Sequence, residues 1–153
     1  MVIDYHIHTN YSDDCEYSME EAVKDAIALG AKEICITDHV DYGVKTDWNS
    51  GEKVTFKAGM YRLNVDYPKF MQELQEQRQK YGEQITIKLG MEFGLQMHTI
   101  DKYEALFAKY PFDFITRYDE NGIYPFEKVK PLIEEVLKTV IADGKGIEVN
   151  TSS

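Results

Sequence analysis

Four side chains that bind transition metals strongly lie where predicted β-strands end: His6, His8, His39 and Glu92. His6 and His8 are two positions apart, so an extended chain presents both imidazoles on one face. A helix would turn them about 200° apart. In folds of alternating strands and helices, ligands gather at the carboxyl ends of the strands. The pattern therefore predicts one metal-binding active site, with ordinary surface or core histidines as the alternative.

The acidic candidates extend this site. Glu92 interrupts an apolar, glycine-rich segment, where a buried carboxylate is costly without a cation or hydrogen-bond donors. Asp14 follows His8 in a loop that can fold back over the strand end, although Asp13 and Asp14 are also typical turn residues. Mixed imidazole and carboxylate ligands favour zinc, manganese or iron over magnesium or calcium.

Further polar residues near strand ends have weaker claims. Asp38 suits a hydrogen-bond partner just outside the metal ligands, or a turn or helix-capping residue. His98 precedes a predicted helix, where a surface or packing role is more common than metal binding. Arg117 has a planar guanidinium that suits a phosphate, with a surface salt bridge as the alternative. Three residues at the end of the last predicted strand are candidate hydrogen-bond donors around the site: Asn150, Ser152 and Ser153.

The composition limits the classes of function. A chain of 153 residues that is 43% hydrophobic has the size of one domain with its own core, so we expect a single domain over residues 1–153. The formal net charge is −10 and the basic residues are scattered, which argues against a nucleic-acid partner. A phosphate-ester substrate stays compatible with this acidity, because bound divalent cations reverse the local potential.

The cysteines and the hydropathy indicate the compartment. Cys15 lies in an acidic loop and Cys35 in an apolar strand, so we expect no disulfide and a reducing environment. No apolar run approaches the roughly 20 residues of a membrane span, and the first residues lack the pattern of a signal peptide. We expect a soluble cytoplasmic protein without a membrane partner; its oligomeric state is not predicted.

Strands and helices alternate along the chain. Apolar segments of strand length cover residues 1–8, 33–39, 85–94, 112–116 and 146–152. Helices are predicted between them, with a capping box at Ser18, Pro68 in a first turn, Thr99 as a cap, and a last helix over 129–140. Residues 40–65 are predicted to be irregular. Helical crossovers imply a parallel sheet, so the fold is α/β, and five strands suggest an open sheet or part of a β/α barrel.

Three segments in this order, DYHIHTNYSDD, ITDH and GMEFG, resemble the opening motifs of the PHP (polymerase and histidinol phosphatase) family. Other segments are similar to its histidinol-phosphatase branch: SMEEAVKDAIALGAKEICITDH, YPFDFI, TRYDENG and GKGIEVNTSS. Members of this family are distorted seven-stranded β/α barrels with two or three divalent transition-metal ions, and they hydrolyse phosphate monoesters. The resemblance implies hydrolysis of L-histidinol phosphate in histidine biosynthesis by in-line attack of metal-activated water.

The resemblance also implies roles for single residues. His6 and His8 would share one ion with Glu92, which bridges to another ion. The remaining ion would be held by Asp14 and His39. Arg117 lies in a stretch similar to the substrate-contacting segment of the family and would bind the phosphate.

The chain departs from the family pattern in two places. A Gly-Ser-x-His motif is missing after Ile115, and a final Asp-x-His motif is missing after Ser153, which implies an internal deletion and a C-terminal truncation. A chain complete in this form is expected to hold fewer ions, more weakly, with low activity. Two alternatives remain open: a non-catalytic, degenerate PHP-type metal-binding domain with a structural or partner-binding role, and a metal-free sheet that binds a small molecule.

Overall fold

The computed structural model describes residues 2–57, 60–94, 96–118, 130, 134, 138, 141–142 and 146–149. Its strands are β1 (Val2–Ile7), β2 (Ala31–Ile36), β3 (His39–Val40), β4 (Thr55–Lys57), β5 (Met60–Arg62), β6 (Thr86–Gly94), β7 (Phe114–Tyr118) and β8 (Gly146–Val149). Its helices are α1 (Met19–Ala28), α2 (Tyr67–Tyr81), α3 (Ile100–Lys109) and the short 3₁₀-helix η1 (Met97–Thr99).

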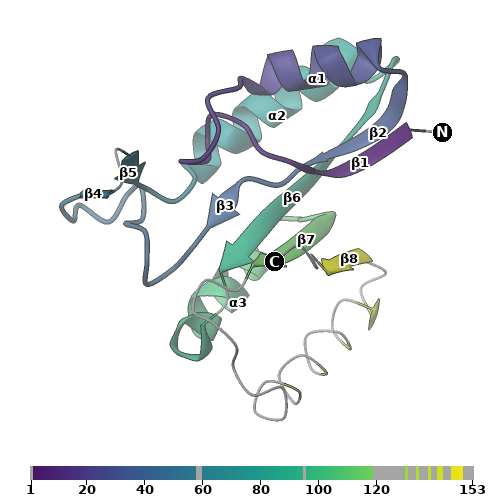
Figure 1. Cartoon of the computed structure of the whole chain (residues 1–153). Coiled ribbons are helices and arrows are strands. Elements are labelled where there is room, and N and C mark those ends of the chain that lie inside the picture. Colours follow the sequence, from purple (N-terminus) through teal and green to yellow (C-terminus); the bar gives the residue numbers. More distant parts are fainter. Residues whose placement is uncertain are drawn as a thin grey trace.

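The main sheet is parallel and follows the chain order. Its strands lie in the order β1-β2-β6-β7-β8, and β3 also pairs with β6 (Figure 1). Each new strand joins the same side of the sheet, as in a β/α barrel, whereas a doubly wound sheet reverses direction. Within the described residues no pairing joins β1 to β8, so the sheet is open. The predicted α/β fold with parallel β/α units is confirmed.

Strand β3 continues the line of β2 along β6. Ile36 pairs with Leu89 and His39 pairs with Glu92, so the register is the same on both sides of the break. The backbone bridges that break, because the Glu92 N–H donates to the Asp38 carbonyl oxygen at 3.0 Å. This register places His39 directly beside Glu92.

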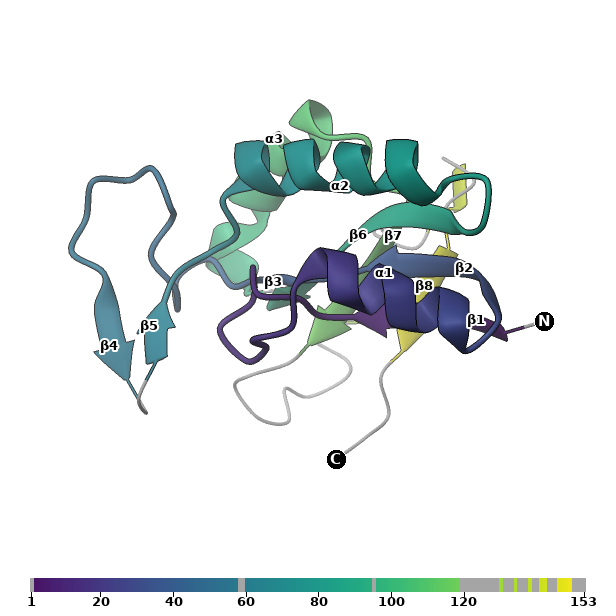
Figure 2. The ribbon, with the colours of Figure 1, turned by 90° about the horizontal axis from the view of Figure 1, so that it is seen from above.

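The prediction that residues 40–65 are irregular is wrong in part. Besides β3, this segment holds the antiparallel hairpin β4–β5, in which Phe56 pairs with Tyr61. Its base is closed by hydrogen bonds from the Thr46 N–H to the Arg62 oxygen (3.0 Å) and from the Asn64 N–H to the Thr46 oxygen (2.9 Å). The hairpin projects from the body of the molecule, beyond β3 (Figures 1 and 2).

Helices α1 and α2 lie side by side and cover the sheet (Figure 2). The predicted capping box of α1 is confirmed: the Ser18 hydroxyl accepts the Glu21 N–H, and the Glu21 carboxylate accepts the Ser18 N–H. Helix α2 starts at the cap Asp66, with Pro68 in its first turn as predicted. Both helices bury one apolar face, formed in α1 by Met19, Ala22, Val23 and Ala26 and in α2 mainly by Phe70, Leu74 and Tyr81.

Helix α3 joins the core through Tyr103, which is 1% exposed and whose ring packs edge-on against Phe93 of β6. Phe107 of the same helix also contacts Phe93 but is 39% exposed. One detail differs from prediction. The Thr99 hydroxyl donates to the Gln96 carbonyl oxygen (2.9 Å) and makes no capping bond to the helix. Most of the helix predicted over 129–140 lies outside the described residues.

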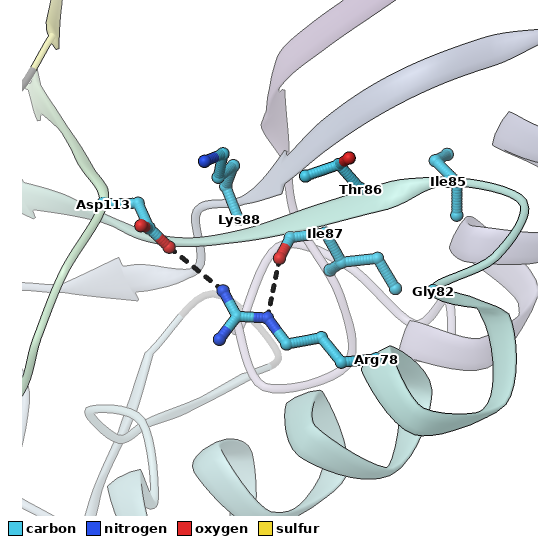
Figure 3. Close-up of a pocket in the computed structure, with 7 residues that line it drawn as sticks. All are labelled: Arg78, Gly82, Ile85, Thr86, Ile87, Lys88 and Asp113. Carbon is cyan, nitrogen blue, oxygen red and sulfur yellow. Dashed lines mark hydrogen bonds and ion pairs between the residues drawn. The ribbon is translucent and has the colours of Figure 1, made fainter.

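A pocket at the amino end of β6 is lined by residues that join α2 to the sheet (Figure 3). The Arg78 guanidinium donates to the Ile87 carbonyl oxygen (2.7 Å) and to the Asp113 carboxylate (3.0 Å). The same carboxylate accepts the Leu89 N–H at 2.9 Å. These bonds link α2 and the residue before β7 to the first half of β6, on the amino-terminal side of Glu92. No helix in the described part of the chain is long and apolar enough to cross a membrane.

Gly90 of β6 has no room for a side chain, and we expect Gly90→Ala to destabilise the protein. A Cβ at this position would lie 2.6 Å from Cys35 Sγ and 2.7 Å from Thr37 Cγ2. Overpacking of this kind costs about 1–3 kcal/mol of unfolding free energy, measurable by urea denaturation. Thr86→Ala shortens an exposed side chain on the same strand and is the control. Equal stability of Gly90→Ala and the control would contradict the tight packing at β6.

Candidate metal centre

The candidate residues come from three neighbouring strands. His6 lies in β1 and His8 follows its last residue, His39 opens β3, and Glu92 lies in β6. Asp14 comes from the loop after β1. Parallel strands bring these ends to one rim of the sheet. Glu92 is 2% exposed, so its carboxylate is held away from bulk water.

The first group of ligand atoms is formed by His6, His8 and Glu92. Glu92 Oε2 lies 3.0 Å from His6 Nε2 and 2.8 Å from His8 Nε2, and the two nitrogens are 3.1 Å apart. A tetrahedral zinc ion with ligands at its usual bond lengths separates ligand atoms by about 3.3–3.6 Å. Two imidazole nitrogens that face one carboxylate oxygen at the observed distances share either a proton or a cation with it. The donor set fits one transition-metal ion, although the ligand atoms lie a few tenths of an ångström closer together than a zinc ion would hold them.

The second group is formed by His8, Asp14 and His39, with ligand atoms within 4.8 Å of one another. Asp14 Oδ2 lies 3.0 Å from His8 Nδ1 and 3.3 Å from His39 Nε2. His39 Nε2 also lies 3.7 Å from Glu92 Oε2, so the groups adjoin. His8 takes part in both, through Nε2 in the first group and Nδ1 in the second.

The electrostatics of the groups favour charged carboxylates and a cation. Burial alone would raise the pKa of Glu92, but the hydrogen bond from His8 and the neighbouring imidazoles hold it below its ordinary value. The same balance of burial against His8 and His39 lowers the pKa of Asp14. Burial opposes protonation of His8, yet Glu92 and Asp14 outweigh it and raise the pKa of His8 to about 9.

Asp38 holds the chain that carries these ligands. Its buried carboxylate accepts the Thr9 N–H at 2.7 Å and the Thr9 hydroxyl at 2.8 Å. Burial raises the pKa of Asp38 in spite of these bonds. Because Thr9 follows His8, Asp38 fixes the exit of β1. Ser12 adds a second tether, since its hydroxyl oxygen accepts the His39 N–H at 2.8 Å.

The structure does not gather every predicted residue. His98 lies in η1, is exposed and belongs to neither group. Arg117 lies in β7, in register with Phe93 and next to the Glu92–Thr116 pair, but its side chain is outside the described part. Three predicted polar residues fall outside the described residues altogether: Asn150, Ser152 and Ser153.

A buried charge network behind the second group was not predicted from the sequence. It consists of Asp13, Asp41, Lys45 and Arg62. The adjacent pair of Asp13 and Asp14 was the signal in the sequence, but both read equally well as turn residues. Asp41, Lys45 and Arg62 lie in the segment predicted to be irregular, where charges are normally solvated.

Fold and site together define an α/β protein with a candidate metal centre at the carboxyl ends of parallel strands. A sequence model of the PHP domain matches residues 4–123. The chain belongs to the PHP domain family.

Two relatives carry histidinol-phosphatase names. Histidinol-phosphatase of Lactococcus lactis is 31% identical over 114 residues, covering 74% of this chain and 37% of its own length. A probable histidinol-phosphatase of Clostridium acetobutylicum is 29% identical, covering 93% of this chain and 52% of its own length. The chain thus spans about a third to a half of these relatives.

A solved structure is also similar. The histidinol phosphate phosphatase of Lactococcus lactis, complexed with zinc, L-histidinol and phosphate, matches with a TM-score of 0.65 and 28% identity. The match covers 78% of this chain and 40% of the other. The described sheet therefore has the fold of a PHP enzyme and corresponds to part of that larger structure.

The metal-free protein should show an elevated pKa at His8, and Glu92→Gln should lower it from about 9 towards the ordinary 6.5. Because the folded state has the higher pKa, protonated His8 stabilises the metal-free protein below pH 6.5, and this contribution is lost as the pH rises through about 9. Histidine NMR titration measures the pKa. Glu83→Gln, at an exposed position, is the charge-matched control; a His8 pKa unchanged by Glu92→Gln would contradict the contact.

Proposed function

We propose that this protein is a metal-dependent phosphomonoesterase that hydrolyses L-histidinol phosphate to L-histidinol and phosphate. The observation that carries the proposal is the meeting of His6, His8 and His39 around the Glu92 carboxylate at the rim of a PHP sheet. The names of the two relatives and the ligands of the solved structure support this substrate and a role in histidine biosynthesis.

The two groups are proposed to hold one divalent ion each. His6, His8 and Glu92 would bind the first ion, and Asp14 and His39, which adjoin Glu92, would bind the second. Zinc is supported by the solved relative, and the mixed imidazole and carboxylate set also suits manganese or iron. We propose that residues 1–153 form one domain. Cys15 and Cys35 are free thiols, in keeping with a reducing cytoplasm.

Each residue then has a distinct task. Divalent ions held by these residues would supply activation of a water molecule and stabilisation of the attacking and leaving oxygens of an in-line displacement. Glu92, buried and ionised, would bind an ion together with the imidazoles of His6 and His8, which lie next to its carboxylate. Asp38 keeps His8 in place through Thr9, and Arg117 would bind the phosphate group of the substrate. The net charge of −10 is compatible with a phosphate substrate, because bound divalent ions would concentrate positive charge at the site.

Removing one ligand should remove both metal and activity. We expect His8→Ala and Glu92→Ala to lower bound zinc, measured by elemental analysis, and to reduce phosphate release from L-histidinol phosphate by at least about 100-fold. His98→Ala changes an exposed histidine outside both groups and is the control. Full activity in both variants would refute the assignment. Zinc binding by the unaltered protein without any phosphate release would favour a non-catalytic metal-binding domain.

Arg117→Ala should weaken substrate binding and leave the zinc content unchanged. Loss of a charge-assisted contact to phosphate corresponds to about a 10–100-fold higher KM. Arg78→Ala is a matched control, because Arg78 makes its contacts at the opposite end of β6 (Figure 3). Lower zinc content with an unchanged KM would show that Arg117 serves the metal site instead of the substrate.

A further inference from the structure

A network of salt bridges, buried except for the partly exposed Arg62, lies behind the second group of ligand atoms. Lys45 Nζ is 2.7 Å from Asp13 Oδ1 and 2.7 Å from Asp41 Oδ2. Arg62 Nη1 is 2.9 Å from Asp13 Oδ2. The side chains of Lys45 and Asp41 are 2% and 1% exposed, so this ion pair is removed from water.

The network is balanced in charge and expensive to bury. Two carboxylates face one ammonium and one guanidinium, so it adds no net charge to the site. Burial by itself lowers the pKa of Lys45, but Asp41 and Asp13 outweigh this effect and raise it, which keeps the ammonium protonated. Apolar side chains of similar volume often stabilise a fold as well as buried ion pairs do. Stabilising the fold is therefore not a sufficient reason for these four charged side chains to lie here, and their effect on neighbouring residues matters more.

The network reaches the second group of ligand atoms by two routes. Asp13 directly precedes Asp14, so holding the Asp13 carboxylate with two cations fixes the backbone that carries Asp14. Asp41 Oδ2 lies 3.9 Å from His39 Nδ1, on the opposite side of the ring from the His39 Nε2 that faces Asp14 and Glu92. The distance of 3.9 Å is too long for a hydrogen bond, but the negative charge of Asp41 favours the ring orientation that turns Nδ1 towards it and Nε2 towards Asp14 and Glu92.

The surrounding chain is shaped to hold Asp41 in this place. Its N–H donates to the Asn64 side-chain oxygen at 2.8 Å. A Cβ at Gly94 would lie 2.4 Å from Asp41 Oδ1, so β6 leaves room for this carboxylate only because residue 94 is glycine. Lys45 and Arg62 stand at the two ends of the segment that contains β4 and β5, so the network also ties the base of that hairpin to the site.

We propose that Asp13, Asp41, Lys45 and Arg62 are positioning residues that set Asp14 and His39 for the second ion. The inference rests on the proposed function, since it assigns a role within the same metal centre. The first ion would depend on His6, His8 and Glu92, whereas the ion pairs of the network hold Asp13, which precedes Asp14, and Asp41, which faces His39. Disturbing the network should therefore weaken one ion selectively.

Zinc titration of variants tests this selectivity. Lys45→Met removes the central ammonium of the network. Gly94→Ala keeps every charge but displaces the Asp41 carboxylate, so this variant tests the proposal if Lys45→Met does not fold. We expect each to weaken the second zinc ion by about 10–100-fold and to leave the first unchanged. Lys24→Met, which breaks an exposed pair with Glu20, is the control. Equal weakening of both ions in a folded variant, or of neither, overturns the proposal.

Histidine NMR of the metal-free protein separates this inference from the proposed function. Lys45→Met and Gly94→Ala should shift the ring nitrogen signals of His39 and leave those of His6 unchanged. If the unaltered protein binds no zinc, the proposed function fails, whatever the variants do. Unchanged His39 signals in both variants overturn the positioning role, even if zinc binds and phosphate is released.

Discussion

The buried carboxylate of Glu92 is the group on which the site depends. One of its oxygens lies 3.0, 2.8 and 3.7 Å from the Nε2 atoms of His6, His8 and His39. A carboxylate at this depth is costly unless hydrogen-bond donors or positive charge compensate it, and a proton on an imidazole or a cation between the rings would do so here. The same requirement explains the raised pKa of His8 and the affinity for metal that we propose.

The order and register of the strands bring these groups together. Helices α1 and α2 carry the chain between parallel strands, so β1, β2 and β6 end at one rim, and β3 continues the line of β2 to set His39 beside Glu92. Asp38 then holds Thr9, and the Lys45 network holds Asp13 and Asp41, so that the ligands are fixed from behind. Buried polar side chains thus surround the candidate site, and apolar packing supports the sheet beneath it.

Local patterns predicted much of this arrangement. Alternation put His6 and His8 on one face, and the Ser18 capping box and Pro68 marked helix starts correctly, because each depends on a few neighbouring residues. Strand β3 was missed, since two residues carry no periodicity and its register is set by β6. The burial of Lys45 could not be predicted either, because it depends on contacts with Asp13 and Asp41 that form only in the folded chain.

The central claim is that His6, His8 and Glu92 grip one metal ion, and anomalous X-ray diffraction from zinc-loaded crystals tests it most directly. The account predicts a zinc peak within about 2.0–2.2 Å of the Nε2 atoms of His6 and His8 and of a Glu92 carboxylate oxygen. Zinc bound elsewhere, with these three side chains apart and pointing in different directions, would contradict it.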